Sequence, residues 1–231
     1  MLQASDGVTQ LNLYTWIPKG LLKKAPTYVV CINHGMAEHA LRYDNFAQFL
    51  CEKNIAVYAH DQRGHGKTAT TESELGFLAD ANGFQHATED LRCVLQTARN
   101  DFPKAKIILL GHSFGSFVSQ SFIEQFGDET DACILSGTAG PRLALTIPGS
   151  VIAAIIKKIK GSRYRSKFLD KLTFGSYLNK IPKPCADFAW LSSDAQAVKA
   201  YEEDPLCGFL CTAGFFYDIT SGLTRIHLQK N

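Results

Sequence analysis

The chain has 231 residues, of which 45% are hydrophobic and 20% charged. These values are typical of a globular protein and exclude an intrinsically disordered chain. The formal net charge is +2, but it is unevenly spread. Between Pro141 and Lys183 ten residues are basic and one, Asp170, is acidic, which gives this segment a charge of +9 and leaves −7 for the remainder. The two parts are therefore expected to meet different partners.

The N-terminal residues and the cysteines indicate in which cellular compartment the chain is expected. Residues 1–7 have neither a basic region nor an apolar core, so no secretory signal is evident, and no apolar run reaches the length of a membrane span. The seven cysteines are odd in number and lack the paired spacing of a zinc site. Cys207 and Cys211 would lie one helical turn apart, and we expect them to pack in a core. A reducing, cytoplasmic location is predicted.

Short apolar runs alternate with segments of helical periodicity along the first 140 residues. Strands are expected at residues 9–16, 28–32, 55–59, 106–110 and 132–137. Helices are expected at residues 42–53, 84–100 and directly after residue 113. The first strand alternates like a half-buried edge strand, whereas the others are continuously apolar. This alternation predicts an α/β fold with a mostly parallel sheet covered by helices on both faces.

The strand at residues 106–110 runs into Gly111-His112-Ser113-Phe114-Gly115. This is the Gly-x-Ser-x-Gly pattern, in which a serine occupies a sharp strand-to-helix turn and the glycines fit where side chains would clash. The pattern alone is weak evidence, but an apolar strand precedes it and a helical pattern follows it. The sequence therefore predicts a nucleophilic serine at the carboxyl end of the sheet.

A second loop with functional potential follows the strand at residues 28–32. The chain continues as His34-Gly35-Met36-Ala37, after which come Glu38 and His39. Because this strand also ends at the carboxyl edge of the sheet, the Met36 backbone amide is free to point toward Ser113.

A different composition begins at residue 141. Residues 143–160 form an apolar helical pattern that ends in Lys157, Lys158 and Lys160. One helical face is expected to hold Val151, Ile152, Ile155, Ile156 and Ile159. This segment is either a buried helix with lysines at its end, or a cap with an apolar inner surface and a basic rim, suited to an acyl chain or an anionic lipid surface. The predicted parts are an α/β core at 1–140, a cap insert at 141–205 and a helical return at 206–231.

These motifs, in this order, resemble the α/β-hydrolase fold, and within it the monoacylglycerol lipase and lysophospholipase group, also described as serine aminopeptidase-like hydrolases. The resemblance covers the chain from about Asp6 onward. It implies that Ser113 is the nucleophile and that the amides of Met36 and Phe114 form the oxyanion hole. The remaining pocket or motif residues that it implies are His34, Gly35, Gly111, His112 and Gly115. It implies no metal and no cofactor, and a substrate that is a single-chain lipid ester.

The chain departs from this resemblance after Ser113. The resemblance places the triad acid and then the histidine on loops after later strands. His227 is the one histidine after Ser113, and it falls in an expected helix with no strand before it. We therefore expect neither triad partner in this chain. The hypothesis is a truncated hydrolase that lacks its last strands, exposes a sheet edge and is nearly inactive.

Three functions follow from these patterns. The first is a carboxylic-ester hydrolase acting on monoacylglycerol or lysophospholipid. The second is a peptidase or thioesterase of the same fold, although a peptidase cap should present acidic groups to a substrate amine and this insert is basic. The third is a pseudo-hydrolase that binds lipid or an anionic membrane surface through the basic cap. Nucleic-acid binding is not expected, because the basic segment is rich in aliphatic residues and contains no recognised module.

Overall fold

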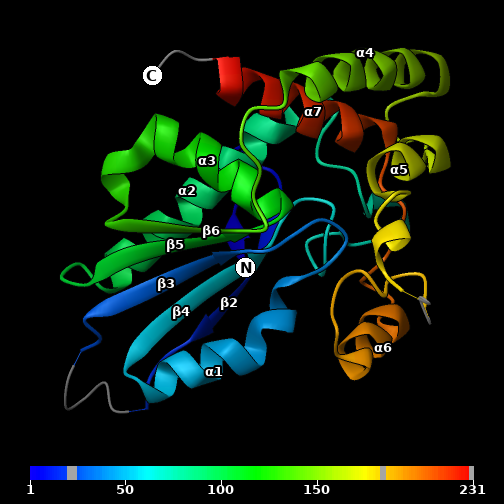
Figure 1. Ribbon diagram of the computed structural model, residues 1–231. Helices are drawn as coiled ribbons and strands as arrows, with labels where there is room; N and C mark the ends of the chain where they lie inside the picture. The colour runs from blue at the N-terminus through cyan, green and yellow to red at the C-terminus, as the bar shows by residue number, and fades with distance from the viewer. Residues whose placement is uncertain (20–24, 183–185, 229–231) are drawn as a thin grey trace.

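The computed structural model describes residues 1–19, 25–182 and 186–228 (Figure 1). In this described part, six strands form one sheet in the order β1-β2-β4-β3-β5-β6. The strands are β1 (Leu2–Gln3), β2 (Gln10–Trp16), β3 (Tyr28–Asn33), β4 (Ile55–Asp61), β5 (Lys106–His112) and β6 (Ala132–Ser136). Strand β2 pairs antiparallel with β1 and β4, and all other pairs are parallel. The predicted α/β fold with a mostly parallel sheet is confirmed.

The central strands explain why their sequences are continuously apolar. In β3 and β4 every residue after the first is buried, because both faces of a parallel sheet are covered. The expected edge strand is β2, but the two-residue strand β1 pairs with its outer side. At the opposite side of the sheet, β6 pairs with β5 alone among the described strands, and its Ile134 side chain is exposed.

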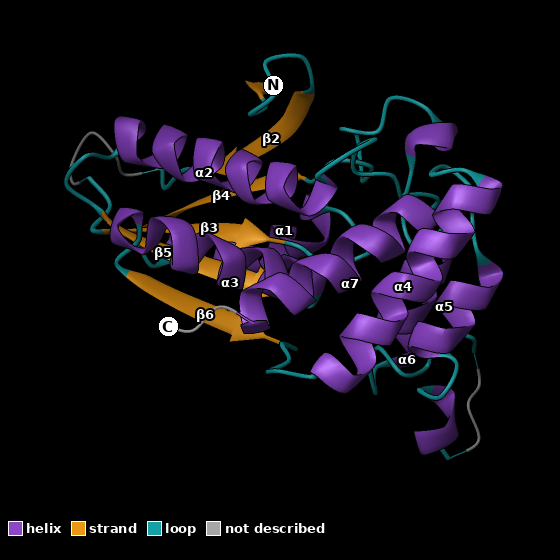
Figure 2. Ribbon diagram, turned by 90° about the horizontal axis from the view of Figure 1, so that it is seen from above, coloured by secondary structure: helices purple, strands orange, loops and turns teal. Residues whose placement is uncertain are grey.

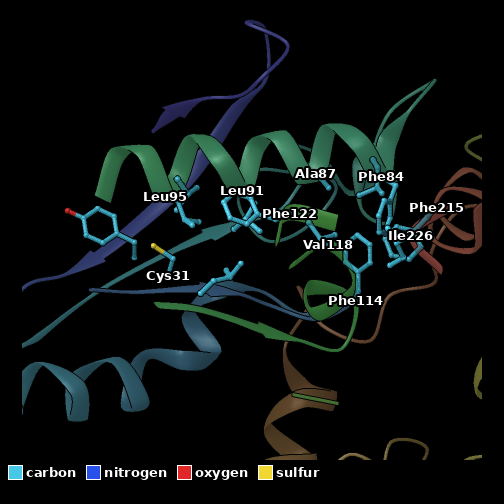
Figure 3. Close-up of a cluster of buried hydrophobic side chains, with 14 of the residues drawn as sticks. Cys31, Phe84, Ala87, Leu91, Leu95, Phe114, Val118, Phe122, Phe215 and Ile226 are labelled. Carbon is cyan, nitrogen blue, oxygen red and sulfur yellow. The ribbon is translucent and has the colours of Figure 1, made fainter. Parts of the chain in front are cut away.

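Helices α2 (Gly83–Asp101) and α3 (Phe114–Phe126) cover one face of the sheet, as Figure 1 shows. The main core lies between them and the strands. Leu91 and Leu95 of α2 meet Val118 and Phe122 of α3 in this core (Figure 3). The apolar residues at helical spacing along α2 are all buried, as a helix with one face on the sheet requires: Phe84, Ala87, Leu91, Val94, Leu95 and Ala98.

The other face is covered by α1 (Asp44–Glu52). The helical spacing of Phe46, Phe49 and Leu50 predicts that they form its inner stripe, and this is wrong for the two phenylalanines. The helix approaches the sheet through the small residue Ala47, which is buried, and Phe46 and Phe49 are exposed. Residues of β5 on this face, such as Leu110, are consequently only half-buried.

The remaining helices lie beyond the carboxyl end of the sheet. They are α4 (Leu143–Lys160), α5 (Lys167–Phe174), α6 (Ala195–Glu203) and α7 (Ala213–Leu228). Short 3-10 helices occur at Ala40–Tyr43, Glu72–Glu74, Gly127–Glu129 and Leu178–Lys180. Helix α7 contacts α2 and α3, and α4 lies along α7 (Figure 2). Because α7 begins at Ala213, the expected helix over Cys207 and Cys211 is wrong.

The apolar residues of α4 divide into two rows. Ile152, Ala153 and Ile156 belong to the row that packs inward, next to α7, and Gly149 lies against Thr220 of α7. Val151, Ile155 and Ile159 are 53%, 52% and 71% exposed. The single apolar face predicted for this helix is therefore wrong, since residues one position apart diverge by about 100° around a helix axis. Among the residues that the structure describes, no helix has both the length and the apolar character needed to cross a bilayer.

Asp218 is a buried carboxyl group at the contact between α7 and α2. It is 3% exposed, and its Oδ2 atom lies so close to the first residue of α2 that a Cβ atom on Gly83 would be 2.2 Å away. Burial raises the pKa of Asp218 from 3.8 to about 6, although Lys157 and the Gly83 amide act in the opposite direction. The fold therefore disfavours the charged form of this side chain.

This raised pKa predicts a pH-dependent effect of Asp218→Asn. Because the folded state holds the proton more tightly than the unfolded state, the contribution of Asp218 to stability falls as pH rises from about 4 to about 6 and stays low above that. The substitution should raise the free energy of unfolding at pH 8 by roughly 2 to 3 kcal/mol and have little effect at pH 4. Urea unfolding at the two pH values measures this.

The exposed Asp128→Asn is the matched control, because it removes a carboxylate from the surface and should change little at either pH. A lower stability of Asp218→Asn at pH 8 would contradict the prediction and would mean that the carboxylate makes a favourable interaction in the fold.

Candidate active site

Ser113 occupies the single residue between β5 and α3. Its backbone has φ 49° and ψ −120°, a conformation that residues other than glycine rarely adopt, at a cost on the order of 1–3 kcal/mol. The strain is the signature of a sharp strand-to-helix turn. The structure thus places Ser113 at the bend that its sequence pattern predicts.

The glycines around Ser113 allow this bend because they bring three backbone segments together. A Cβ atom on Gly115 would lie 2.1 Å from the Asn33 carbonyl oxygen and 2.4 Å from that of His34. A Cβ atom on Gly111 would lie 2.4 Å from Ser119 Oγ. The first turn of α3 therefore packs directly on the end of β3, and side chains at these two positions would push them apart.

The loop after β3 passes against Ser113. A Cβ atom on Gly35 would lie 3.3 Å from the Cβ atom of Ser113. The Gly35 amide itself donates to Glu38 Oε1 at 2.5 Å. By contrast, neither the Met36 nor the Phe114 amide donates to a protein acceptor in the described part of the chain. Two backbone donors near the serine are thus free to bind a ligand oxygen.

His34 holds this loop in place and uses both ring nitrogens to do so. Its Nδ1 donates to the Gly35 carbonyl at 2.7 Å, and its Nε2 accepts from the Gln62 amide at 3.0 Å. Burial lowers the pKa of His34, so the ring is neutral. A histidine with both nitrogens engaged cannot take a proton from Ser113, and its place agrees with a structural role.

Two other histidines approach the bend without reaching the hydroxyl. His65 lies parallel to the Phe114 ring, with centroids 6.2 Å apart, and its Nδ1 donates to the Arg63 carbonyl at 2.8 Å. Burial lowers its pKa to about 3. His112 points Nδ1 toward Ser136 Oγ at 3.4 Å and lines a cavity of about 370 Å³ on the α1 face of the sheet.

His227 lies further away. Its Nε2 is 3.2 Å from Oε1 of Gln120, which is two helical turns beyond Ser113 along α3. Among the described residues, no side chain accepts a hydrogen bond from the Ser113 hydroxyl. The site therefore combines a strained serine with two amides that have no protein acceptor, and the described residues bring no general base to it.

A second cavity, of about 500 Å³, extends from Met36 and Ala37 into the segment at residues 141–205. An aromatic cluster that sequence reasoning missed forms part of its wall. Phe174 and Trp190 are stacked with centroids 5.6 Å apart, and Phe209 lies nearby on the cavity wall. The concentration of aromatic residues between positions 168 and 217 was the available signal. Such a wall suits an apolar ligand.

Comparison with known proteins agrees with this geometry. The profile of the family described as "Serine aminopeptidase, S33" matches residues 24–231. The chain is 33% identical to monoacylglycerol lipase from Mycolicibacterium smegmatis over 181 residues, which are 78% of this chain and 56% of the lipase. It is 31% identical to monoglyceride lipase from Rattus norvegicus over 202 residues, 86% of this chain and 56% of that lipase. The chain spans about half the length of these curated relatives.

A solved structure supports the fold. The carboxyl esterase of Bacillus coagulans, in complex with glycerol, matches with a TM-score of 0.85 at 22% identity, over 96% of this chain and 70% of the esterase. The strained serine bend, the mostly parallel sheet and the family profile lead to one conclusion: the chain belongs to the serine aminopeptidase S33 family of α/β-hydrolases, in the group that resembles monoacylglycerol lipases.

Proposed function

We propose that Ser113 is the nucleophile of carboxylic-ester hydrolysis and that the Met36 and Phe114 amides form its oxyanion hole. The observation that carries this proposal is the strained serine next to two amides without protein acceptors. As the serine oxygen bonds to the ester carbonyl carbon, the carbonyl oxygen becomes negatively charged. Two fixed N–H donors stabilise that charge without reorganisation. The alcohol then leaves, and water releases the acyl group from Ser113.

The substrate class that we propose is a single-chain lipid ester, either a monoacylglycerol or a lysophospholipid. The cavity beyond Met36 supports it, because aromatic side chains line much of its wall. Both similar lipases are named for cleavage of such lipids. The charge of the cavity wall does not distinguish a lipid-ester hydrolase from a peptidase. Two acidic residues, Asp170 and Asp187, line the cavity together with two basic ones, Lys167 and Lys171. The apolar wall favours the lipid.

The proposed reaction also needs a base to accept the Ser113 proton, because a neutral serine hydroxyl is a poor nucleophile. No described histidine or carboxylate receives that proton. We propose that the base and its acid partner come from outside the described residues and that this chain alone hydrolyses esters only slowly. The cavity beside His112, next to the β6 edge, is open to such a segment.

Imidazole added to the solution tests both parts of this proposal. With a short-chain p-nitrophenyl ester, the chain should show slow turnover that free imidazole raises by at least about 10-fold, because imidazole replaces part of the missing general-base catalysis. The increase should be absent in Ser113→Ala and intact in Ser150→Ala. The release of p-nitrophenol, corrected for the reaction of imidazole alone, measures the rate.

The two possible failures have different meanings. If turnover is fast without imidazole and disappears in Ser113→Ala, the proposal that this chain lacks its base is wrong. The proposal that Ser113 is the nucleophile would then still stand. Equal imidazole effects in the parent chain and in Ser113→Ala would contradict the nucleophile and favour a lipid-binding pseudo-hydrolase.

We also propose that the 141–205 segment acts as a cap that contacts an anionic membrane surface. The exposed apolar row of α4, formed by Val151, Ile155 and Ile159, supports this contact. Phe168 and Leu172 of α5 in the same segment are exposed as well. Such a surface with lysines beside it is the pattern of helices that lie at a membrane interface. Lys157 lies over the Tyr217 ring at 4.9 Å, so the exposed Lys158 and Lys160 are the better candidates for lipid contact.

Sedimentation with phosphatidylserine-containing vesicles tests the membrane contact. Neutralising Lys158 and Lys160 to Gln should weaken binding by roughly 30-fold, at about 1 kcal/mol per lysine. Neutralising the exposed Lys67 and Lys104, which lie on other surfaces, should have little effect. Similar losses in both double variants would contradict a specific contact through α4.

A further inference from the structure

Three side chains with metal-binding atoms meet at a place distinct from the serine. His39 follows the loop that carries Met36, whereas Asp204 and Cys207 follow helix α6. The nearest ligand atoms of the three residues all lie within 4.8 Å of one another. We propose that His39, Asp204 and Cys207 form a binding site for a divalent transition-metal ion of the zinc type.

The spacing of the three atoms needs little change to surround an ion. His39 Nε2 and Asp204 Oδ2 are hydrogen-bonded at 2.8 Å. In a tetrahedral zinc site with bonds of about 2.0 Å to nitrogen and oxygen, these two atoms would be about 3.3 Å apart. The Sγ atom of Cys207 lies within 4.8 Å of both atoms, and in such a site it would be about 3.5 Å from each. The required changes in these distances are therefore on the order of 1 Å.

The backbone around the cluster is already fixed by other contacts. The Ala37 carbonyl accepts hydrogen bonds from Tyr201 Oη at 2.8 Å and from the Gly208 amide at 2.9 Å. In the later segment the two donors flank Asp204 and Cys207, and in the earlier one Ala37 lies two residues before His39. Two segments about 165 residues apart in sequence are thus held together without any ion, so a metal would meet preorganised ligands.

Further hydrogen bonds orient the carboxylate. Asp204 Oδ1 accepts from the Leu206 amide at 2.8 Å, and its carbonyl oxygen accepts from the Cys207 amide at 2.9 Å. The first bond leaves Oδ2 turned toward His39. Partners of this kind are what direct carboxylate ligands toward a metal.

The ligand set selects the chemistry of the ion. One thiolate, one imidazole and one carboxylate suit zinc and cobalt and exclude magnesium and calcium, which prefer oxygen alone. As the metal–sulfur bond forms, the Cys207 thiol loses its proton to solvent. His39 offers the lone pair of Nε2 with its proton on Nδ1, and its hydrogen bond to Asp204 is replaced. Two negative ligands then balance the charge of the ion. The positive charge of the nearby Arg42 guanidinium does not add to that of the ion, because Arg42 is already paired with Glu38.

Three protein ligands leave a fourth position for water, on the side where Asp204 is partly exposed. The ion would join the loop after β3 to the segment after α6. Its ligand in that loop, His39, is three residues from Met36. Metal binding does not depend on the proposed ester hydrolysis, and its test does not require turnover.

Titration with Co²⁺ tests the site in the intact chain. One equivalent should bind and produce the near-ultraviolet absorption of a thiolate-to-cobalt transition together with the visible bands of tetrahedral Co²⁺. Zn²⁺ should displace it. Cys207→Ser should remove the thiolate band, and Asp204→Asn should weaken binding by more than about 100-fold, because loss of a direct ligand exceeds the effect of losing an outer hydrogen bond.

The control is Cys211→Ser, which alters a buried thiol four residues further on that lies outside the cluster. It should bind Co²⁺ like the parent chain. Circular dichroism checks that each variant is folded, and Zn²⁺ should raise the melting temperature of the parent and of Cys211→Ser but not of Cys207→Ser. Absence of stoichiometric Co²⁺ binding to the folded parent chain, or equal loss of the thiolate band in both cysteine variants, would overturn the proposal.

Discussion

The site depends on one strained residue held by its surroundings. The φ of 49° at Ser113 persists because several contacts fix the bend. The Ser113 amide donates to the Ser136 carbonyl at 2.9 Å, and the Ser113 carbonyl accepts from Ser116 Oγ at 2.6 Å. Gly115 rests on the carbonyl groups at the end of β3. The strained backbone of Ser113 is therefore stabilised by contacts with several elements, namely β3, β5, β6 and α3.

The loop that faces the serine is held from two sides. On one side, the His34 ring and the Glu38 carboxylate bind Gly35, and the Gln62 amide at the end of β4 binds the His34 ring. From the segment after α6, Tyr201 and Gly208 bind the carbonyl of Ala37, which itself has a φ of 52°. The Met36 amide thus takes its position from the sheet and from residues more than 160 positions later. Any movement of that later segment would reach the proposed oxyanion hole directly.

Much of the fold could be predicted because the responsible signals are local. Strands β3 and β4 lie between covered faces, so their sequences are apolar without interruption. The stripe of α2 follows from one helix packing on one sheet. The bend at Ser113 could be predicted from the Gly-x-Ser-x-Gly pattern, because few backbone conformations require a glycine two residues before and two residues after a serine.

The features that sequence analysis missed depend on partners far along the chain. Nothing within α4 distinguishes its inner row from its outer row, because α7 decides which one is buried. For the same reason, α1 buries Ala47 and leaves two phenylalanines exposed. The meeting of His39 with Asp204 joins residues 165 positions apart. Spacing within a sequence carries no information on such contacts.

The central claim is that the Ser113 oxygen faces two backbone donors, and a trapped adduct tests it most directly. A crystal structure of the chain after prolonged reaction with an alkyl phosphonofluoridate should show phosphorus bonded to Ser113 Oγ. The phosphoryl oxygen should lie about 3 Å from the Met36 and Phe114 amides. A label on another residue, or a phosphoryl oxygen turned away from both amides, would contradict the account.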